Sequence, residues 1–167
     1  MRSFLATLLF CGLAVTATAA PTFPKLTGRV VDEANMISPA ATQQINGMLA
    51  SHEAASKNQV VVVTVPDLQG YAIEEFGYQL GRHWGIGQKD ENNGVLFIVA
   101  KQERKLRIEV GYGLEGDLTD AISSNIISTR ITPAFKQGQF DEGIVTGTAA
   151  IMEALGGEYA MRKTSGT

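Results

Sequence analysis

Two short apolar runs constrain the fold of this chain most strongly. Residues 60–65 and 95–100 are each six residues long, contain no charged residue and consist almost entirely of aliphatic and aromatic side chains. Such runs are typical of strands that are covered on both faces, as in a parallel sheet packed between helices. They are far shorter than the roughly 20 apolar residues that cross a bilayer. The sequence therefore predicts a sheet buried between two layers of helices.

Helical periodicity and one alternating segment surround these two strands. Ser38-Pro39 combines a hydroxyl N-cap with a proline at the first helical position. Thr119 or Asp120 is expected to cap the third helix, Pro133 to end it, and Asp141 to cap the fourth helix. Strands joined by a helix should be parallel, and strands joined by a tight turn antiparallel. We therefore expect an α/β fold, a three-layer sandwich with a small mixed β-sheet and helices on both faces. The expected elements are helices over roughly 38–58, 73–85, 120–132 and 141–155, and an edge strand over 106–110.

The first 19 residues have the pattern of a signal peptide. Arg2 precedes an apolar run over residues 4–15, and Ala17-Thr18-Ala19 supplies the small residues that a signal peptidase recognises. We expect cleavage after Ala19 and export to the periplasm or the medium. The single cysteine, Cys11, would be removed with the signal peptide, so the mature chain would hold neither a disulfide nor a thiolate metal site.

The remaining residues are expected to form one monomeric domain. A leader is expected over residues 20–28, the α/β domain over 29–155 and a polar tail over 156–167, with no transmembrane anchor in the mature chain. The chain has 14 Lys and Arg against 17 Asp and Glu, a net charge of −3 without a basic stretch. We therefore expect no nucleic-acid partner.

Two acidic loops are expected to meet at one end of the sheet. Residues 89–94 precede the second strand and residues 111–120 follow the third, and a hairpin between these strands brings the two loops together. Carboxylates, asparagine and backbone carbonyls suit a hard cation, Ca²⁺ or Mg²⁺, better than Zn²⁺. The alternative is that the acidic residues only cap a helix, form turns or face solvent. The candidate metal ligands are Asp90, Glu115, Asp117 and Asp120.

The glycines of the second loop have a second possible interpretation. Gly111, Gly113 and Gly116 match the spacing of a dinucleotide-binding loop, but no further parallel strand follows to bind the ribose. We interpret them as providing backbone freedom for a tight exposed loop. The sequence has no Gly-x-Ser-x-Gly or His-Glu-x-x-His motif, and His52 and His83 are interpreted as surface or helix-end residues.

Several segments resemble one family over residues 28–155. They are Gly-Arg-Val-Val-Asp-Glu-Ala at 28–34, Trp-Gly-Ile-Gly at 84–87, Asn-Gly-Val-Leu at 93–96 and, most distinctively, Gly-Tyr-Gly-Leu-Glu-Gly at 111–116. Together they are similar to the TPM-domain family. The resemblance implies a helix-covered sheet in an exported or membrane-associated protein. Members of that family include a thylakoid-lumen acid phosphatase linked to photosystem II repair, calcium-binding proteins and an animal protein that assists a receptor.

The resemblance also implies site residues and a function. It supports Asp32, Glu115 and Asp120 as site candidates. Asp32 is expected at the opposite end of the sheet from Glu115, where it would either form a second site with Asp67 or order the chain that enters the first helix. The function expected is an exported divalent-cation-binding accessory or quality-control module with an unidentified exported or membrane protein partner. The alternative is a metal-dependent acid phosphatase.

Overall fold

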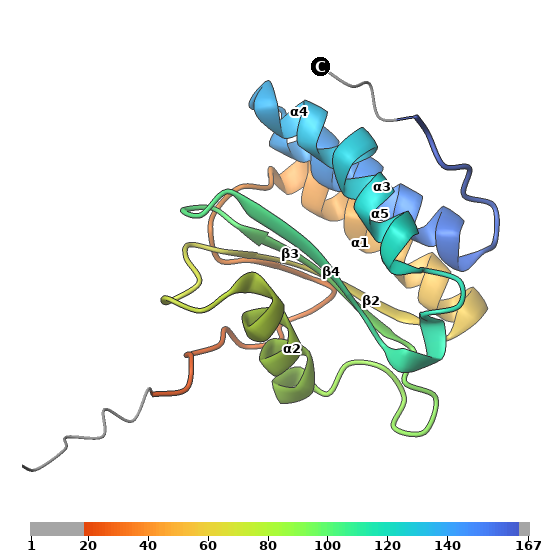
Figure 1. The fold of residues 1–167 in the computed structure, drawn as a ribbon, viewed down its shortest axis with the longest axis horizontal. Helices are drawn as coiled ribbons and strands as arrows, with labels where there is room; N and C mark the ends of the chain where they lie inside the picture. The colour runs from red at the N-terminus through yellow and green to blue at the C-terminus, as the bar shows by residue number, and fades with distance from the viewer. Residues whose placement is uncertain (1–18, 164–167) are drawn as a thin grey trace, which may run out of the picture.

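The computed structural model describes residues 19–163 and contains one mixed sheet with the strand order β1-β2-β3-β4 (Figure 1). Strands β1, β2 and β3 are parallel, and β4 is antiparallel to β3. The expected hairpin and the expected edge position of its second strand are both confirmed. Except for Ala19, the expected signal peptide lies outside the described residues. The strands are β1 (Val30–Asp32), β2 (Gln59–Val65), β3 (Gly94–Ala100) and β4 (Lys105–Val110).

Helices cover both faces of this sheet, which confirms the three-layer α/β fold (Figure 1). Helix α2 (Ile73–Trp84) packs on one face against Val61, Val63 and Leu96. The other face is covered by helices from both halves of the chain, and Val60, Val62 and Phe97 point into that second core. Those helices are α1 (Pro39–Ser56), α3 (Asp120–Ile126), α4 (Thr132–Lys136) and α5 (Phe140–Leu155).

The sequence did not predict β1. This strand has three residues, which is too short to show an alternating pattern, and it pairs Val30 with Val62 and Asp32 with Thr64 at the edge of the sheet. The expected sheet therefore gains a fourth strand, and the segment before the first helix forms part of the core instead of a loop.

The expected helix starts at Ser38 and Thr119 are confirmed. The Ser38 hydroxyl accepts a hydrogen bond from the Ala41 N–H at 3.2 Å, and the Thr119 hydroxyl accepts one from the Ile122 N–H at 3.2 Å. Gly85, with φ 59°, ends α2 in the left-handed conformation that favours glycine. Local capping chemistry therefore predicts these three helix ends correctly.

Two expected helix ends are wrong. Pro133 does not break the third helix, because a π-helical turn, η2 (Ile127–Ile131), joins α3 to α4 and places the proline in the first turn of α4. The first turn is the part of a helix that tolerates proline best. Asp141 does not cap α5, which begins one residue earlier at Phe140 without a side-chain cap. Instead, its Oδ1 accepts a hydrogen bond from the Ser38 N–H at 2.8 Å.

The segments before β1 and after α5 both return to the domain. The Phe23 ring packs edge-on against Phe76 of α2 at a centroid distance of 5.3 Å, and the Trp84 Nε1–H donates to the Pro24 carbonyl at 2.8 Å. At the other end, the Asn125 side chain of α3 accepts from the Tyr159 hydroxyl at 2.8 Å and donates to the Arg162 carbonyl at 2.7 Å. Among residues 19–163, no helix combines the length and hydrophobicity that a membrane span requires.

Candidate cation-binding site where two loops meet

The β3–β4 hairpin brings the two acidic loops into direct contact. The Gly111 N–H donates to the Gly94 carbonyl at 2.7 Å, and the Gly113 N–H donates to the Asn92 carbonyl at 3.2 Å. After β4, the chain turns through the short 3-10 helix η1 (Tyr112–Leu114). A Cβ on Gly113 would lie only 2.0 Å from the Glu91 carbonyl oxygen. The expected meeting of the two loops is therefore confirmed, and the contact is too close for side chains at its centre.

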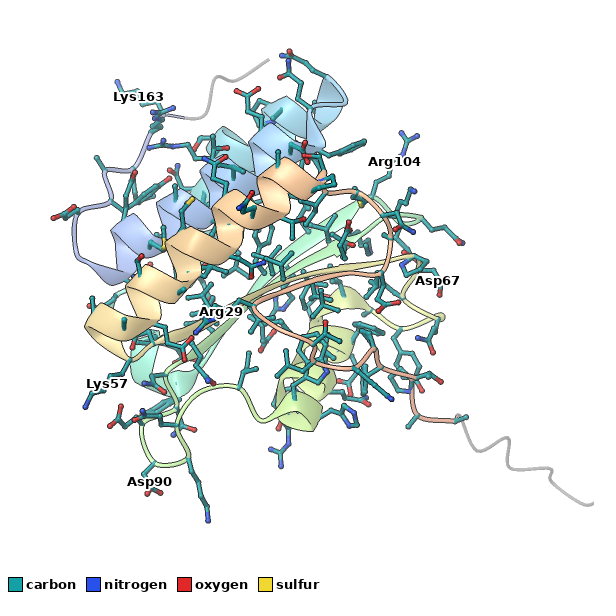
Figure 2. The ribbon with its side chains drawn as sticks, turned by 180° about the vertical axis from the view of Figure 1, so that it is seen from behind. Arg29, Lys57, Asp67, Asp90, Arg104 and Lys163 are labelled. Carbon is teal, nitrogen blue, oxygen red and sulfur yellow. The ribbon has the colours of Figure 1, made fainter. Side chains whose placement is uncertain are left out.

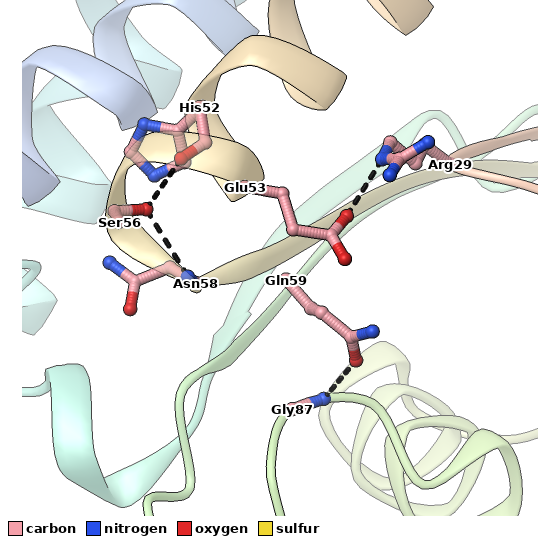
Figure 3. A network of polar contacts seen from close by, with 7 residues as sticks. All are labelled: Arg29, His52, Glu53, Ser56, Asn58, Gln59 and Gly87. Atoms are coloured by element: carbon pink, nitrogen blue, oxygen red, sulfur yellow. Dashed lines mark hydrogen bonds and ion pairs between the residues drawn. The ribbon is translucent and has the colours of Figure 1, made fainter.

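Two amide side chains hold the first of these loops in place. Asn93 is 4% exposed, its Oδ1 accepts from the Gln88 N–H at 2.6 Å, and its Nδ2 donates to the Lys57 carbonyl at 3.0 Å. The Gln59 Oε1 accepts from the Gly87 N–H at 2.6 Å (Figure 3). Sequence reasoning counted the asparagine as a possible ligand and missed Gln59. The structure uses both amides to shape the loop.

The four candidate carboxylates all lie at this end of the molecule and are all exposed. Asp90 projects outward from its loop (Figure 2). Thr119 caps α3, so Asp120 occupies the first helical turn without serving as the N-cap. Glu115 and Asp117 lie between η1 and α3. Within the described part of the chain, however, no three His, Cys, Asp or Glu side chains gather closely enough to hold a metal ion.

The donor atoms at this end therefore suit a hard cation chemically, but they are not assembled around one point. The donors are carboxylate oxygens on exposed turns, which is the ligand type that Ca²⁺ and Mg²⁺ prefer. To bind an ion together, the side chains would have to turn inward, and their exposure leaves room for that movement. Such ordering lowers affinity, because part of the binding free energy is spent on fixing side-chain rotamers.

Asp32 lies at the opposite end of the sheet, as expected, and its carboxylate accepts hydrogen bonds from neighbouring parts of the chain. Oδ1 accepts from the Met36 N–H at 2.9 Å and from the Thr64 hydroxyl at 2.5 Å, and Oδ2 accepts from the Ile37 N–H at 3.0 Å. The Asp67 carboxylate accepts from the Gln69 N–H at 2.8 Å. Of the two roles considered for Asp32, these contacts favour ordering the chain that enters α1.

The surroundings of His52 in α1 alter its acidity. Burial lowers the pKa of His52 below its usual value of 6.5, because the charged imidazolium is poorly solvated there. In the described structure its Nε2 is buried without a hydrogen-bond partner, and its backbone carbonyl accepts from the Ser56 hydroxyl at 2.7 Å (Figure 3). A neutral imidazole without an acid or base partner is typical of a structural histidine.

Comparison with known proteins supports one family. The TPM domain model matches residues 30–154. The N-terminal domain of a P. gingivalis protein, solved by NMR, is 36% identical, with a TM-score of 0.73 over 82% of this chain and 88% of that chain.

Two further NMR structures share the fold at lower identity. The N-terminal domain of a Corynebacterium glutamicum protein is 18% identical, with a TM-score of 0.60 over 90% of this chain and 93% of that one. A protein from the psychrophilic bacterium Bizionia argentinensis is 19% identical, with a TM-score of 0.63 over 76% of this chain and 86% of that one. No curated protein matches the sequence. The family model and the 36% identical structure together show that this chain belongs to the TPM domain family.

Proposed function

We propose that this protein is an exported divalent-cation-binding accessory or quality-control module of the TPM type, acting on an exported or membrane protein. One observation carries the proposal. The Gly113–Asn92 hydrogen bond holds two acidic loops together at one end of the sheet. Export is supported by the charged, apolar and small-residue pattern of residues 1–19.

The negative charge of the two loops supports cation binding. Asp90 lies on one loop, and Glu115, Asp117 and Asp120 lie on the other, with no lysine or arginine in residues 111–120. Like charges on adjoining loops repel one another, and a bound divalent cation would relieve that repulsion. Because the carboxylates are exposed and not assembled in advance, we expect weak binding, with a Kd of about 10⁻⁴–10⁻³ M as in other extracellular Ca²⁺ modules.

Thermal unfolding in millimolar Ca²⁺ or Mg²⁺ tests this proposal. A ligand that binds only the folded state at a tenfold excess over its Kd stabilises that state by about 1.4 kcal/mol, which corresponds to a rise of a few degrees in Tm. Glu115→Gln and Asp120→Asn should each remove the shift. Asp67→Asn is the matched control, because it neutralises a carboxylate beyond the other end of β2 and should keep the shift. The absence of a shift in the wild type would contradict the proposal.

Turnover of an aryl phosphate separates the accessory role from the phosphatase alternative. We expect no turnover with or without Ca²⁺ or Mg²⁺, since the sequence has no recognisable nucleophile or general-base motif. Metal-dependent turnover that disappears in Asp120→Asn would replace the accessory role with a metal-dependent phosphatase.

A further inference from the structure

A basic pocket lies at the opposite end of the sheet from the acidic loops. It has a volume of about 880 Å³ and opens between the turn of the β3–β4 hairpin and the segment that joins α4 to α5. Its charged lining consists of Lys101, Arg104, Lys105 and Lys136, and no acidic residue of the described range 19–163 lines it. A chain with a net charge of −3 therefore gathers four of its 14 cations around one recess.

The charged side chains of the β3–β4 turn make contacts on two different sides of the hairpin. Lys101 and Arg104 line the pocket, and the Lys101 Nζ is held by the Ala34 carbonyl at 3.1 Å. Glu103 lies between them in sequence but contacts the β2–α2 connection, where its Oε1 accepts from the Leu68 N–H at 2.9 Å. Figure 2 shows Arg104 projecting from this end of the molecule. Among residues 19–163, none of these four cations forms an ion pair with a carboxylate, so the pocket lining keeps its positive charge.

The rest of the pocket is largely apolar. Phe135 and Phe140 meet edge to face with their ring centroids 5.2 Å apart, and Phe140 is 38% exposed. Met36 and Leu106 complete the apolar wall. A half-exposed aromatic ring beside a recess of this volume offers a surface on which an inserted side chain can stack.

We infer that this pocket binds an acidic peptide segment that carries an aromatic or aliphatic side chain. The cations of the pocket attract the acidic residues of the peptide. The aromatic or aliphatic side chain between these acidic residues packs against the apolar wall. A flat anionic bilayer would reach the rim but could not fill a recess, and a nucleic acid would leave the aromatic wall unused unless its bases unstacked. The inference rests on the proposed accessory role, for which it names the docking surface and the chemistry of the partner.

Fluorescence anisotropy with a labelled hexapeptide, Gly-Asp-Glu-Phe-Asp-Gly, tests the inference at low salt. Saturable binding to the wild-type protein is expected, weakening with added salt and with replacement of the peptide phenylalanine by glycine. Lys105→Glu with Lys136→Glu should weaken binding about tenfold or more, since two attractions become repulsions. Lys25→Glu with Lys163→Glu makes the same change in net charge at exposed positions outside the pocket and should leave binding unchanged.

A second variant keeps the test independent of charge. Phe140→Ala removes a half-exposed ring and should weaken binding severalfold, with an unfolding temperature that verifies the fold. Undetectable binding to the wild type, equal weakening in both double variants, or capture of phosphatidylglycerol vesicles in place of the peptide would each overturn the inference. Glu115→Gln should bind the peptide like the wild type, so a failure of Ca²⁺ binding and a failure of peptide binding are separate results.

Discussion

The glycines of residues 111–116 serve a different purpose from the one that the sequence suggests. Gly111 has φ −63°, and none of Gly111, Gly113 and Gly116 has a positive φ. Their interpretation as backbone freedom is therefore wrong. A Cβ on Gly111 would lie 2.2 Å from the Asn92 carbonyl oxygen, and a Cβ on Gly113 would be equally crowded, whereas Gly116 has open space around it. The first two glycines permit the close contact of the loops.

We predict that Gly113→Ala lowers the free energy of unfolding by about 1–3 kcal/mol, because the methyl group must push the 88–93 loop away. Gly116→Ala is the matched control in the same segment and should change stability by no more than about 0.5–1 kcal/mol. Urea denaturation measures both. Equal effects of the two substitutions would show that the loops are not held together, and the proposed cation site would lose its structural basis.

At the scale of elements, one side chain joins the two long helices of the same layer. The Asp141 carboxylate in the first turn of α5 accepts a hydrogen bond from the Ser38 N–H, immediately before α1. These residues are 103 positions apart in sequence. The contact satisfies a backbone donor at the start of α1 that the helix itself cannot satisfy.

Asp141→Ala should therefore lower the free energy of unfolding by about 1.5–3 kcal/mol, the usual contribution of a hydrogen bond to a charged group. Glu142→Ala removes the same charge from the same helical turn at an exposed position and should cost less than about 0.5 kcal/mol. Chemical denaturation of both variants provides the comparison. Similar losses would mean that favourable charge near the helix N-terminus, rather than the bond to Ser38, is responsible.

The sequence predicts elements well wherever a single local pattern decides them. The apolar runs of β2 and β3 and the caps at Ser38 and Thr119 are such cases, and the hairpin fixed which loops meet. Three features were missed. The strand β1 and the role of Asp141 depend on contacts distant in sequence, and the passage of the helix past Pro133 depends on the π-helical turn η2. The candidate site divides in the same way. Topology places its loops, but no local pattern reveals that Asn93 is buried.

At the scale of the whole molecule, the leader completes the layer formed by α2. Phe23 packs between Phe76 and His83, with ring centroids 5.3 and 5.1 Å away, and Thr22 exchanges two hydrogen bonds with the Gln69 side chain. These contacts all lie after Ala19, so the expected cleavage would leave them intact. The leader is therefore part of the folded domain.

Phe23→Ala should lower the free energy of unfolding by about 2–3 kcal/mol, somewhat less than a fully buried phenylalanine, because the ring is half-buried. Leu26→Ala removes an apolar side chain from the same segment where it is 43% exposed, and should change stability by about 0.5 kcal/mol or less. Thermal or urea unfolding measures both. A negligible effect of Phe23→Ala would show that the domain is stable without its leader.

The two edge strands of the sheet affect how copies of this protein associate. The edge strands of a sheet carry unpaired N–H and C=O groups, with which strands of neighbouring molecules could pair. One edge strand, β1, has only three residues. The other, β4, carries Lys105 and the Arg107–Glu109 ion pair at 2.6 Å. Short or charged edge strands make poor templates for pairing with strands of another molecule. The fold thus limits fibrous aggregation through the edges of its sheet.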